Sequence, residues 1–255
     1  MKFTIITPTY KRPTKLVRAV ASMVAQSVTD WKMIIVNDNP GDGATDAIAE
    51  LGDSRIHILE NDLNHGVNYS RNRGLDSISP LSDWVIFLDD DDTLATDALK
   101  QLTQLITATK VPWIVTARGT DSATPTTKGV SKKMYSYIWD YLIWRKFKGD
   151  ATHCIKTSLI NTPTHPLRFP TLIKQAEEWL FYSELGTRTR FYYEPLVTTL
   201  TPGYDANGLN YRSRSLKEQL RLIPIILSEA RGRGLYVSPA FWIYVKMRII
   251  RAFVK

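Results

Sequence analysis

The sequence predicts an α/β protein built on a Rossmann-like, mostly parallel sheet flanked by helices. Short apolar, β-branched segments alternate with segments of helical spacing through the first 120 residues. Strands that alternate with helices usually lie parallel and are joined by right-handed crossovers. In addition, polar motifs follow four of the predicted strands directly, and ligands of such sheets bind at the carboxyl ends of the strands. These observations together predict one domain with a site at one sheet edge.

The regular first half contains five predicted strands and four predicted helices. The strands are Phe3–Thr7, Trp31–Asn37, Arg55–Glu60, Trp84–Leu88 and Trp113–Ala117. The helices are Pro13–Gln26, Thr45–Leu51, Val67–Ser77 and Asp97–Thr109. The first helix has apolar residues at positions 16, 17, 20, 23 and 24 and begins with a proline, as helices often do.

The alternation weakens after Ala117. The predicted helices there are Tyr135–Phe147, Gln175–Leu185, Ser215–Ala230 and Pro239–Phe253, and the predicted strands are Ala151–Lys156 and Arg190–Glu194. Residues 120–133 and 201–213 are predicted loops, and we expect Pro224 to kink or split its helix. We expect a nucleotide-binding half over 1–117, an acceptor half over 118–213 and a basic helical C-terminal extension over 214–255.

The composition is that of a globular protein, with 44% hydrophobic and 23% charged residues in 255. It excludes a disordered or collagen-like chain. The single cysteine, Cys154, cannot form an internal disulfide, which favours a reducing compartment. No apolar segment reaches the roughly 20 residues of a membrane-spanning helix, and the N-terminus lacks a signal-peptide pattern. We therefore expect a cytoplasmic protein.

The net charge of +8 belongs to the end of the chain. Residues 1–211 contain 23 Lys and Arg against 23 Asp and Glu, whereas residues 212–255 contain 10 against 2. The neutral body argues against a nucleic-acid-binding protein, the first alternative that a basic composition suggests.

Four consecutive carboxylates, Asp89–Asp92, directly follow the predicted strand Trp84–Leu88. Clustered carboxylates raise one another's pKa values unless cations lie among them. Mg²⁺ and Mn²⁺ prefer such oxygen ligands, with substrate phosphates completing the coordination. The alternative is a solvated turn in which Asp92 or Thr93 caps a helix.

Three further motifs end other predicted strands. They are Thr7–Tyr10, Asn37–Asn39 and the segment Asn64–Gly74, which opens a helix. The Tyr10 ring can stack on a base, and Asp38 can accept a hydrogen bond from a base. A helix N-terminus with Arg71 nearby suits a diphosphate.

The four motifs in this order resemble those of family 2 glycosyltransferases, inverting enzymes of the GT-A fold that use nucleotide-sugar donors. The resemblance implies nucleotide-binding roles for Pro8, Thr9, Tyr10, Arg12, Asp38, Asn64, Gly66, Arg71, Asp89 and Asp90. It implies Mn²⁺ or Mg²⁺ held by Asp91 and Asp89, with the register within the run open to a shift of one residue. Asp38 is followed by Asn-Pro where Gly-Ser is commoner in the family.

An inverting transfer also needs a general base for the acceptor hydroxyl. The segment Ala176–Phe181 resembles the family's Glu-Asp-Trp motif, which implies Glu178 as the base and Glu177 in support. The alternative is that both acids only complement a helix dipole.

The resemblance implies a UDP-linked donor and a glycan or lipid-linked acceptor of surface polysaccharide or lipooligosaccharide synthesis, with no nucleic acid. A sugar nucleotidyltransferase is the second alternative, but the expected glycine-rich loop is missing after the first strand. The segment 239–255 combines basic residues with Trp and Phe, as a helix on an anionic membrane does. Packing of its apolar side on the domain is the other interpretation, so a peripheral location on the inner face of the cytoplasmic membrane stays open.

Overall fold

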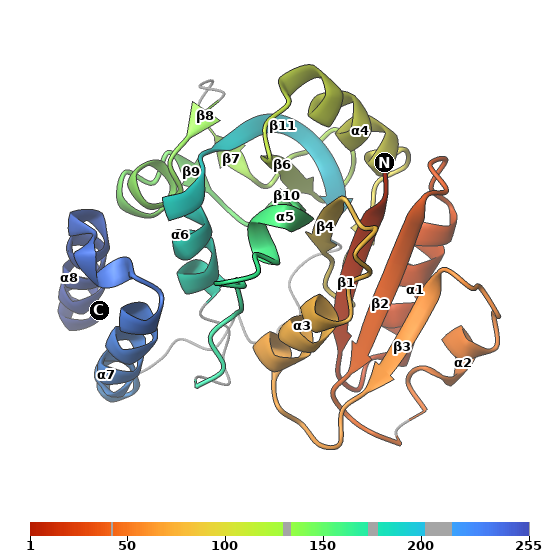
Figure 1. Ribbon diagram of the computed structural model, residues 1–255, viewed down its shortest axis with the longest axis horizontal. Helices are drawn as coiled ribbons and strands as arrows, with labels where there is room; N and C mark the ends of the chain where they lie inside the picture. The colour runs from red at the N-terminus through yellow and green to blue at the C-terminus, as the bar shows by residue number, and fades with distance from the viewer. Residues whose placement is uncertain (42, 130–133, 173–177, 202–215, 255) are drawn as a thin grey trace.

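The computed structural model describes residues 1–41, 43–129, 134–172, 178–201 and 216–254. Figure 1 shows a twisted sheet flanked by helices, with the two last long helices packed together at one side. The strands are β1 (Phe3–Thr9), β2 (Trp31–Asn37), β3 (Ile56–Glu60), β4 (Trp84–Phe87), β5 (Thr93–Leu94), β6 (Trp113–Gly119), β7 (Lys128–Gly129), β8 (Met134–Tyr135), β9 (Phe147–Lys148), β10 (Ala151–Lys156) and β11 (Phe191–Leu200). The helices are α1 (Pro13–Val24), α2 (Asp46–Ala49), α3 (Val67–Asp76), α4 (Ala98–Thr109), η1 (Tyr137–Ile143), α5 (Thr157–Ile160), α6 (Glu178–Arg188), α7 (Leu216–Gly232), η3 (Leu235–Val237) and α8 (Pro239–Val254).

The main sheet is mixed and has the order β3-β2-β1-β4-β10-β6-β11-β5, with β8 paired to β11. Strands β1 to β4 are parallel, which confirms the predicted α/β class. Strand β10 is antiparallel to both of its neighbours, β4 and β6. It therefore joins the parallel first half to the strands of the second half.

The order of the parallel strands places a switch point between β1 and β4. The chain moves outward from β1 through β2 to β3, and helix α3 then returns it to the other side of β1. Strand β4 pairs with β1 only as far as Ile6 and Phe87, so the segments beyond these residues leave the ladder. Ligands of open α/β sheets bind at such points, outside the carboxyl ends of the strands.

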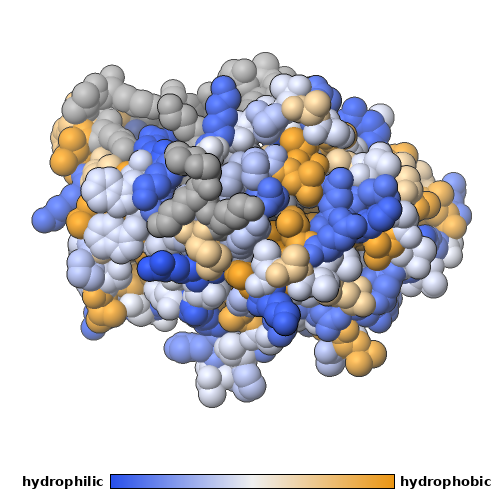
Figure 2. Space-filling view, turned by 90° about the horizontal axis from the view of Figure 1, so that it is seen from above, coloured by the Kyte–Doolittle hydropathy of each residue, from blue (hydrophilic) through white to orange (hydrophobic). Residues whose placement is uncertain are grey.

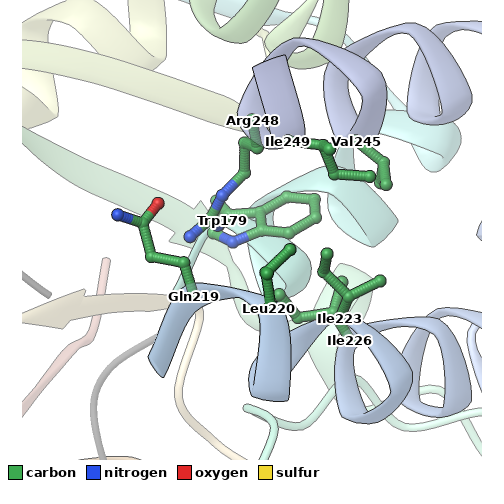
Figure 3. A pocket seen from close by; sticks show the side chains of 8 residues that line it. All are labelled: Trp179, Gln219, Leu220, Ile223, Ile226, Val245, Arg248 and Ile249. Carbon is green, nitrogen blue, oxygen red and sulfur yellow. The ribbon is translucent and has the colours of Figure 1, made fainter. Parts of the chain in front are cut away.

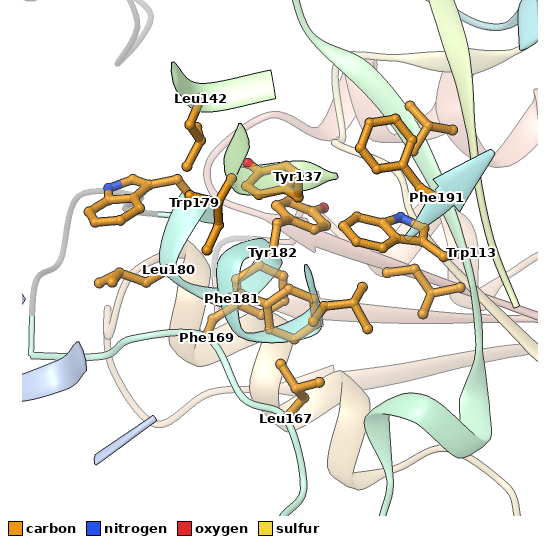
Figure 4. Close-up of a cluster of buried hydrophobic side chains, with 14 of the residues drawn as sticks. Trp113, Tyr137, Leu142, Leu167, Phe169, Trp179, Leu180, Phe181, Tyr182 and Phe191 are labelled. Carbon is orange, nitrogen blue, oxygen red and sulfur yellow. The ribbon is translucent and has the colours of Figure 1, made fainter. Parts of the chain in front are cut away.

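Alternate residues of the strands face two cores because side chains point to opposite faces of a strand. Phe3 and Ile5 of β1 pack with α1 and α4, whereas Ile6 belongs to the core on the other face. That second core is rich in aromatic rings (Figure 4), among them Phe169 stacked on Phe181 with centroids 4.0 Å apart. On the face shown in Figure 2, hydrophobic groups are interspersed with hydrophilic ones.

The second half departs from the predictions in several places, and the short strands β7, β8 and β9 and the helix α5 were not predicted. Strand β11 continues through Pro195 to Leu200, beyond the predicted end at Glu194, because its far end pairs with β6 and with β5. The predicted helix 135–147 is the shorter π-helix η1, and Phe147 belongs to β9, which pairs antiparallel with β7 in a separate two-stranded sheet. Helix α7 runs without interruption through Pro224, so this proline does not split it.

Helices α7 and α8 share the aromatic-rich core with the second half of the sheet. Ile226, Leu235, Phe241 and Val245 are buried there. Arg233, directly after α7, links α7 to α6. Its guanidinium donates to the Glu184 carboxylate of α6 at 2.9 Å and to Glu229 of α7 at 3.1 Å. In the part of the chain that the structure describes, no helix is long and apolar enough to cross a membrane.

Candidate active site

The four acidic residues after β4 divide into two pairs of different exposure. Asp90 and Asp92 are buried, at 5% and 2% exposure. The side chains of Asp89 and Asp91 are each 34% exposed at the carboxyl edge of the sheet. Alternation along the run thus leaves two carboxylates, separated by one residue, accessible to a ligand.

The buried pair is held by residues from neighbouring strands. Thr9, the last residue of β1, donates from Oγ1 to Asp90 Oδ2 at 2.9 Å. Arg118 of β6 donates from Nη1 to Asp92 Oδ2 at 2.7 Å. Burial raises the pKa of Asp90, and it raises the pKa of Asp92 to about 6 although Arg118 opposes the shift. Both carboxylates are therefore held inside the acidic turn, and the nucleotide-binding role of Asp90 stays a prediction.

Three arginines neutralise the accessible carboxylates. Arg12 donates to Asp91 Oδ2 at 3.0 Å and to Asp90 Oδ1 at 3.2 Å. Arg71 donates to Asp89 Oδ1 at 2.7 Å, and Arg118 lies 3.8 Å from Asp89 Oδ2. Burial alone would raise the pKa of Asp89, but the charges of Arg71 and Arg118 outweigh it and lower the pKa.

Glu178 lies at the beginning of α6 and reaches the same cluster. Its Oε1 accepts a hydrogen bond from Arg71 Nη1 at 2.5 Å, so Arg71 bridges Glu178 and Asp89. The Glu178 side chain is 39% exposed, whereas Arg71 is 4% exposed. The structure therefore brings together the predicted base and a predicted metal ligand around one buried guanidinium. Glu177, its predicted supporting residue, lies outside the described residues.

Asp38, at the end of β2, organises the loop before α3. Its Oδ1 accepts hydrogen bonds from Asn61 Nδ2 at 2.7 Å and His65 N at 2.9 Å, and its Oδ2 accepts one from Gly66 N at 2.7 Å. Gly66 has a φ of 93°, a conformation that suits glycine, and it precedes the first turn of α3. Asp38 thus positions the loop that contains Asn64 and the helix that contains Arg71.

Two further predicted nucleotide-binding residues, Pro8 and Tyr10, lie at the end of β1. Pro8 is buried in the strand opposite Val36 of β2. The Tyr10 side chain is 41% exposed, with Lys11 Nζ 5.2 Å from its ring centroid. An exposed ring directly after β1 is available for stacking on a base, so this role stays a prediction.

The donor set fits a divalent cation that binds together with a diphosphate. No group of three or more His, Cys, Asp or Glu side chains that could hold a metal ion occurs among the described residues. Mg²⁺ and similar ions, however, commonly bind through one or two carboxylates plus substrate phosphates. Asp89 and Asp91 provide two accessible carboxylates of that kind.

Arg118 is the site residue that the sequence predictions omitted. Its guanidinium contacts both Asp92 and Asp89, and its side chain is 16% exposed. The sequence does contain a signal for Arg118, because it directly follows the predicted strand Trp113–Ala117. The other motifs were identified by the same position at the end of a predicted strand. His153 and Cys154, in contrast, are buried in the two cores, and burial lowers the pKa of His153 to about 3.

The fold is that of the GT-A glycosyltransferases. It matches S. aureus TarS (residues 1–349) in complex with UDP-GlcNAc at a TM-score of 0.69 and 18% identity, over 90% of this chain and 66% of that one. It also matches a mannosyltransferase from Pyrobaculum calidifontis in complex with GDP-Man and Mn²⁺ at a TM-score of 0.60 and 15% identity, over 100% of this chain and 86% of that one.

The chain belongs to glycosyltransferase family 2, because the profile described as "Glycosyl transferase family 2" matches residues 4–162. It is 31% identical over 166 residues to a GalNAc(5)-diNAcBac-PP-undecaprenol β-1,3-glucosyltransferase of Campylobacter jejuni, over 62% of this chain and 53% of that protein. It is 36% identical over 110 residues to the succinoglycan biosynthesis protein ExoW of Rhizobium meliloti, over 42% of this chain and 34% of ExoW. The chain thus spans about half of the first relative's length and a third of the second's.

Proposed function

We propose that this protein transfers a sugar, with inversion, from a nucleotide-sugar donor to a hydroxyl group of a glycan or lipid-linked acceptor. The observation that supports it most strongly is the cluster of Asp89, Asp91 and Glu178 around Arg12 and Arg71, at the switch point of the sheet. The family and the relatives named above support the reaction class. A UDP-linked donor is proposed by analogy with the TarS complex.

The donor diphosphate would lie beside Asp89 and Asp91, which would hold Mn²⁺ or Mg²⁺. When bound, such a cation neutralises the negative charge that develops on the departing diphosphate. Arg12 and Arg71, now paired to these carboxylates, are the cations next to that position. Thr9 and Asp38 keep the surrounding turn and loop in place.

Glu178 would act as the general base. The acceptor oxygen attacks the anomeric carbon, the bond from that carbon to the phosphate oxygen breaks, and Glu178 takes the hydroxyl proton. Arg71 holds Oε1 of Glu178, so we assign the proton to Oε2. A general base positioned in this way typically increases the reaction rate 10²- to 10⁴-fold.

Glu178→Gln and Asp91→Asn test the two roles separately. With UDP-sugars, an undecaprenyl diphosphate-linked sugar and Mn²⁺, Glu178→Gln should reduce kcat at least about 100-fold. Asp91→Asn should instead raise the Mn²⁺ concentration required for half-maximal activity at least about tenfold, because a neutral amide is a poorer cation ligand. Exposed Glu50→Gln is the matched control and should retain wild-type kinetics. Wild-type kinetics in both site variants would contradict the assigned mechanism.

The sugar nucleotidyltransferase alternative predicts a different product. Such an enzyme would release inorganic pyrophosphate from a nucleoside triphosphate and a sugar phosphate, and would leave lipid-linked acceptors unchanged. Assaying both reactions in one preparation separates the two functions.

We further propose that α8 contacts an anionic membrane surface that contains the acceptor, on the cytoplasmic side. Its inner side packs on the domain through Phe241 and Val245. Its outer side leaves Ile243, Ile250 and Phe253 exposed by 39%, 61% and 63%. The packing seen here and the proposed membrane contact therefore concern different sides of one helix, and apolar residues of this kind insert at a headgroup boundary.

A further inference from the structure

Beside the candidate base, helices α6, α7 and α8 enclose an apolar groove that none of the roles above uses (Figure 3). Leu220 and Ile223 line it from α7, and Ile249 lines it from α8. Trp179 of α6 points between the two helices and forms the inner wall.

The groove and the catalytic edge lie on two sides of the same helix end. Consecutive residues of an α-helix point about 100° apart. Glu178 accordingly faces Arg71 in the acidic cluster, whereas Trp179 faces α7 and α8. The inner end of a ligand bound in the groove would therefore lie beside Trp179, the residue that follows the proposed general base in the chain.

The lining selects a hydrocarbon rather than a sugar. Sugar sites need many hydrogen-bonding groups and open aromatic faces, whereas aliphatic side chains dominate this groove and its polar members are Gln219 and Arg248. The Trp179 ring is 9% exposed and packs against Tyr244, with centroids 4.8 Å apart. Aliphatic walls of this kind gain free energy by removing apolar surface from water.

A cation among the lining residues suits an anionic head on that hydrocarbon. The Arg248 guanidinium belongs to the lining and lies 5.5 Å from the centroid of the Trp179 ring. Arginine is well suited to binding phosphate groups.

We propose that this groove binds the polyisoprenoid chain of a lipid diphosphate acceptor, with the diphosphate near Arg248 and the sugar end directed toward Glu178. The inference rests on the proposed function for the identity of the acceptor. The lipid class is consistent with the Campylobacter jejuni relative described above, which is named for an undecaprenol diphosphate-linked acceptor.

Calorimetric titration of the full-length chain with farnesyl diphosphate tests the groove directly. Excess UDP is present to fill the donor site, and inorganic pyrophosphate is the probe without a hydrocarbon. Wild-type protein should bind farnesyl diphosphate at least about tenfold more tightly than pyrophosphate. Leu220→Gln and Ile223→Gln should each remove most of this difference and leave pyrophosphate binding unchanged, because each loses apolar contact with the chain.

Val17→Gln is the matched control, since Val17 is a helical residue exposed to a similar degree as Leu220, 40% against 38%, on the distant helix α1. Equal affinity for both probes, or unchanged farnesyl diphosphate binding in folded groove variants, would overturn the inference. So would sedimentation showing that the groove variants convert a dimer into a monomer, because the groove would then be an interface between two copies.

The failure of this inference is distinguishable from that of the proposed function. Turnover of UDP-sugars without groove-dependent binding of farnesyl diphosphate would leave the transferase function intact and reject the lipid groove. Groove-dependent binding without any UDP-sugar turnover would reject the proposed function and leave a lipid diphosphate site.

Discussion

Arg71 joins two carboxylates that approach it from different parts of the chain. Asp89 lies 18 residues after it and Glu178 lies 107 residues after it. A nearly buried arginine between two carboxylates keeps its charge, and their negative charges raise its pKa further despite burial. The guanidinium therefore positions the proposed base relative to the proposed metal ligands in the absence of substrate.

His153 is a second buried residue with a shifted pKa, at a distance from the reacting groups. Trp113 Nε1 donates to its Nδ1 at 3.1 Å, and the ring stacks on Tyr182 with centroids 4.0 Å apart. Burial first, and then the charge of Arg118, lower its pKa from 6.5 to about 3. The imidazole therefore stays neutral in the folded protein near pH 6.5, where the unfolded chain begins to protonate it.

We predict that His153 makes the fold acid-sensitive. Below pH 6.5 the unfolded state binds a proton on His153, whereas the folded state binds it only near pH 3. As the pH falls through that window, His153 therefore lowers the free energy of unfolding. The slope from this residue approaches about 1.4 kcal/mol per pH unit. Urea denaturation between pH 7 and 4 should show a smaller slope for His153→Asn than for the wild type.

The control is His57→Asn at an exposed position, which should retain the wild-type slope. Equal pH slopes for His153→Asn and wild type would contradict the prediction. An NMR titration in which the His153 imidazole protonates near pH 6.5 in the folded protein would contradict it as well.

At the scale of elements, α3 determines where Arg71 lies, and it does so by packing very closely on β1. A Cβ atom at Gly74 would lie 2.5 Å from Cγ2 of Ile6, a residue of β1 with 0% exposure. The loop before α3 is fixed from the other side by Asp38. The Gly74 contact and the Asp38 carboxylate therefore both restrict the position of the helix.

We expect Gly74→Ala to destabilise the protein by about 1–3 kcal/mol, the usual cost of overpacking a dense core. It should also lower kcat, since α3 must move away from β1 and take Arg71 with it. Urea denaturation and steady-state kinetics measure the two effects. Gly232→Ala in α7 is the matched control, because nothing lies within 4 Å of its added methyl group. Similar stability of the two variants would show that the α3–β1 contact is not limiting.

At the scale of the whole molecule, α7 and α8 complete the aromatic-rich core and also present an apolar outer surface. Deleting them would remove Phe241 and Val245 from the core and uncover the Trp179 ring that packs on Phe241, so a truncated chain is a poor test of membrane binding. Substitution on the outer side of α8 separates the two roles.

Ile250→Glu should weaken cosedimentation with vesicles that contain anionic lipid at least about fivefold and leave the melting temperature unchanged. The added negative charge opposes the surface potential, and the lost side chain is 61% exposed in the folded protein. Leu81→Glu, at an exposed loop position far from α8 in sequence, is the control and should bind vesicles as the wild type does. Vesicle binding by Ile250→Glu at the wild-type level would reject α8 as the membrane contact.

Local pattern predicted most of the first half of the fold. Five strands and their helices were placed within a few residues, because period-2 and helical spacings are visible in the sequence alone. Local pattern predicted the helices and strands after Ala117 less well. The far end of β11 and the two-stranded sheet of β7 and β9 depend on pairing between segments that are not adjacent in the chain, and neither leaves a local signature.

The sequence by itself determined which residues stand at the carboxyl edge of the sheet, since each motif directly follows its own strand. Only the tertiary structure decided how they pair. The crossovers bring Arg118 and Arg71 to the acidic run and divide that run into buried Asp90 and Asp92 and accessible Asp89 and Asp91. The physical reason is that these ion pairs form between side chains far apart in sequence, so their geometry follows from the order of the strands and the packing of α3 and α6.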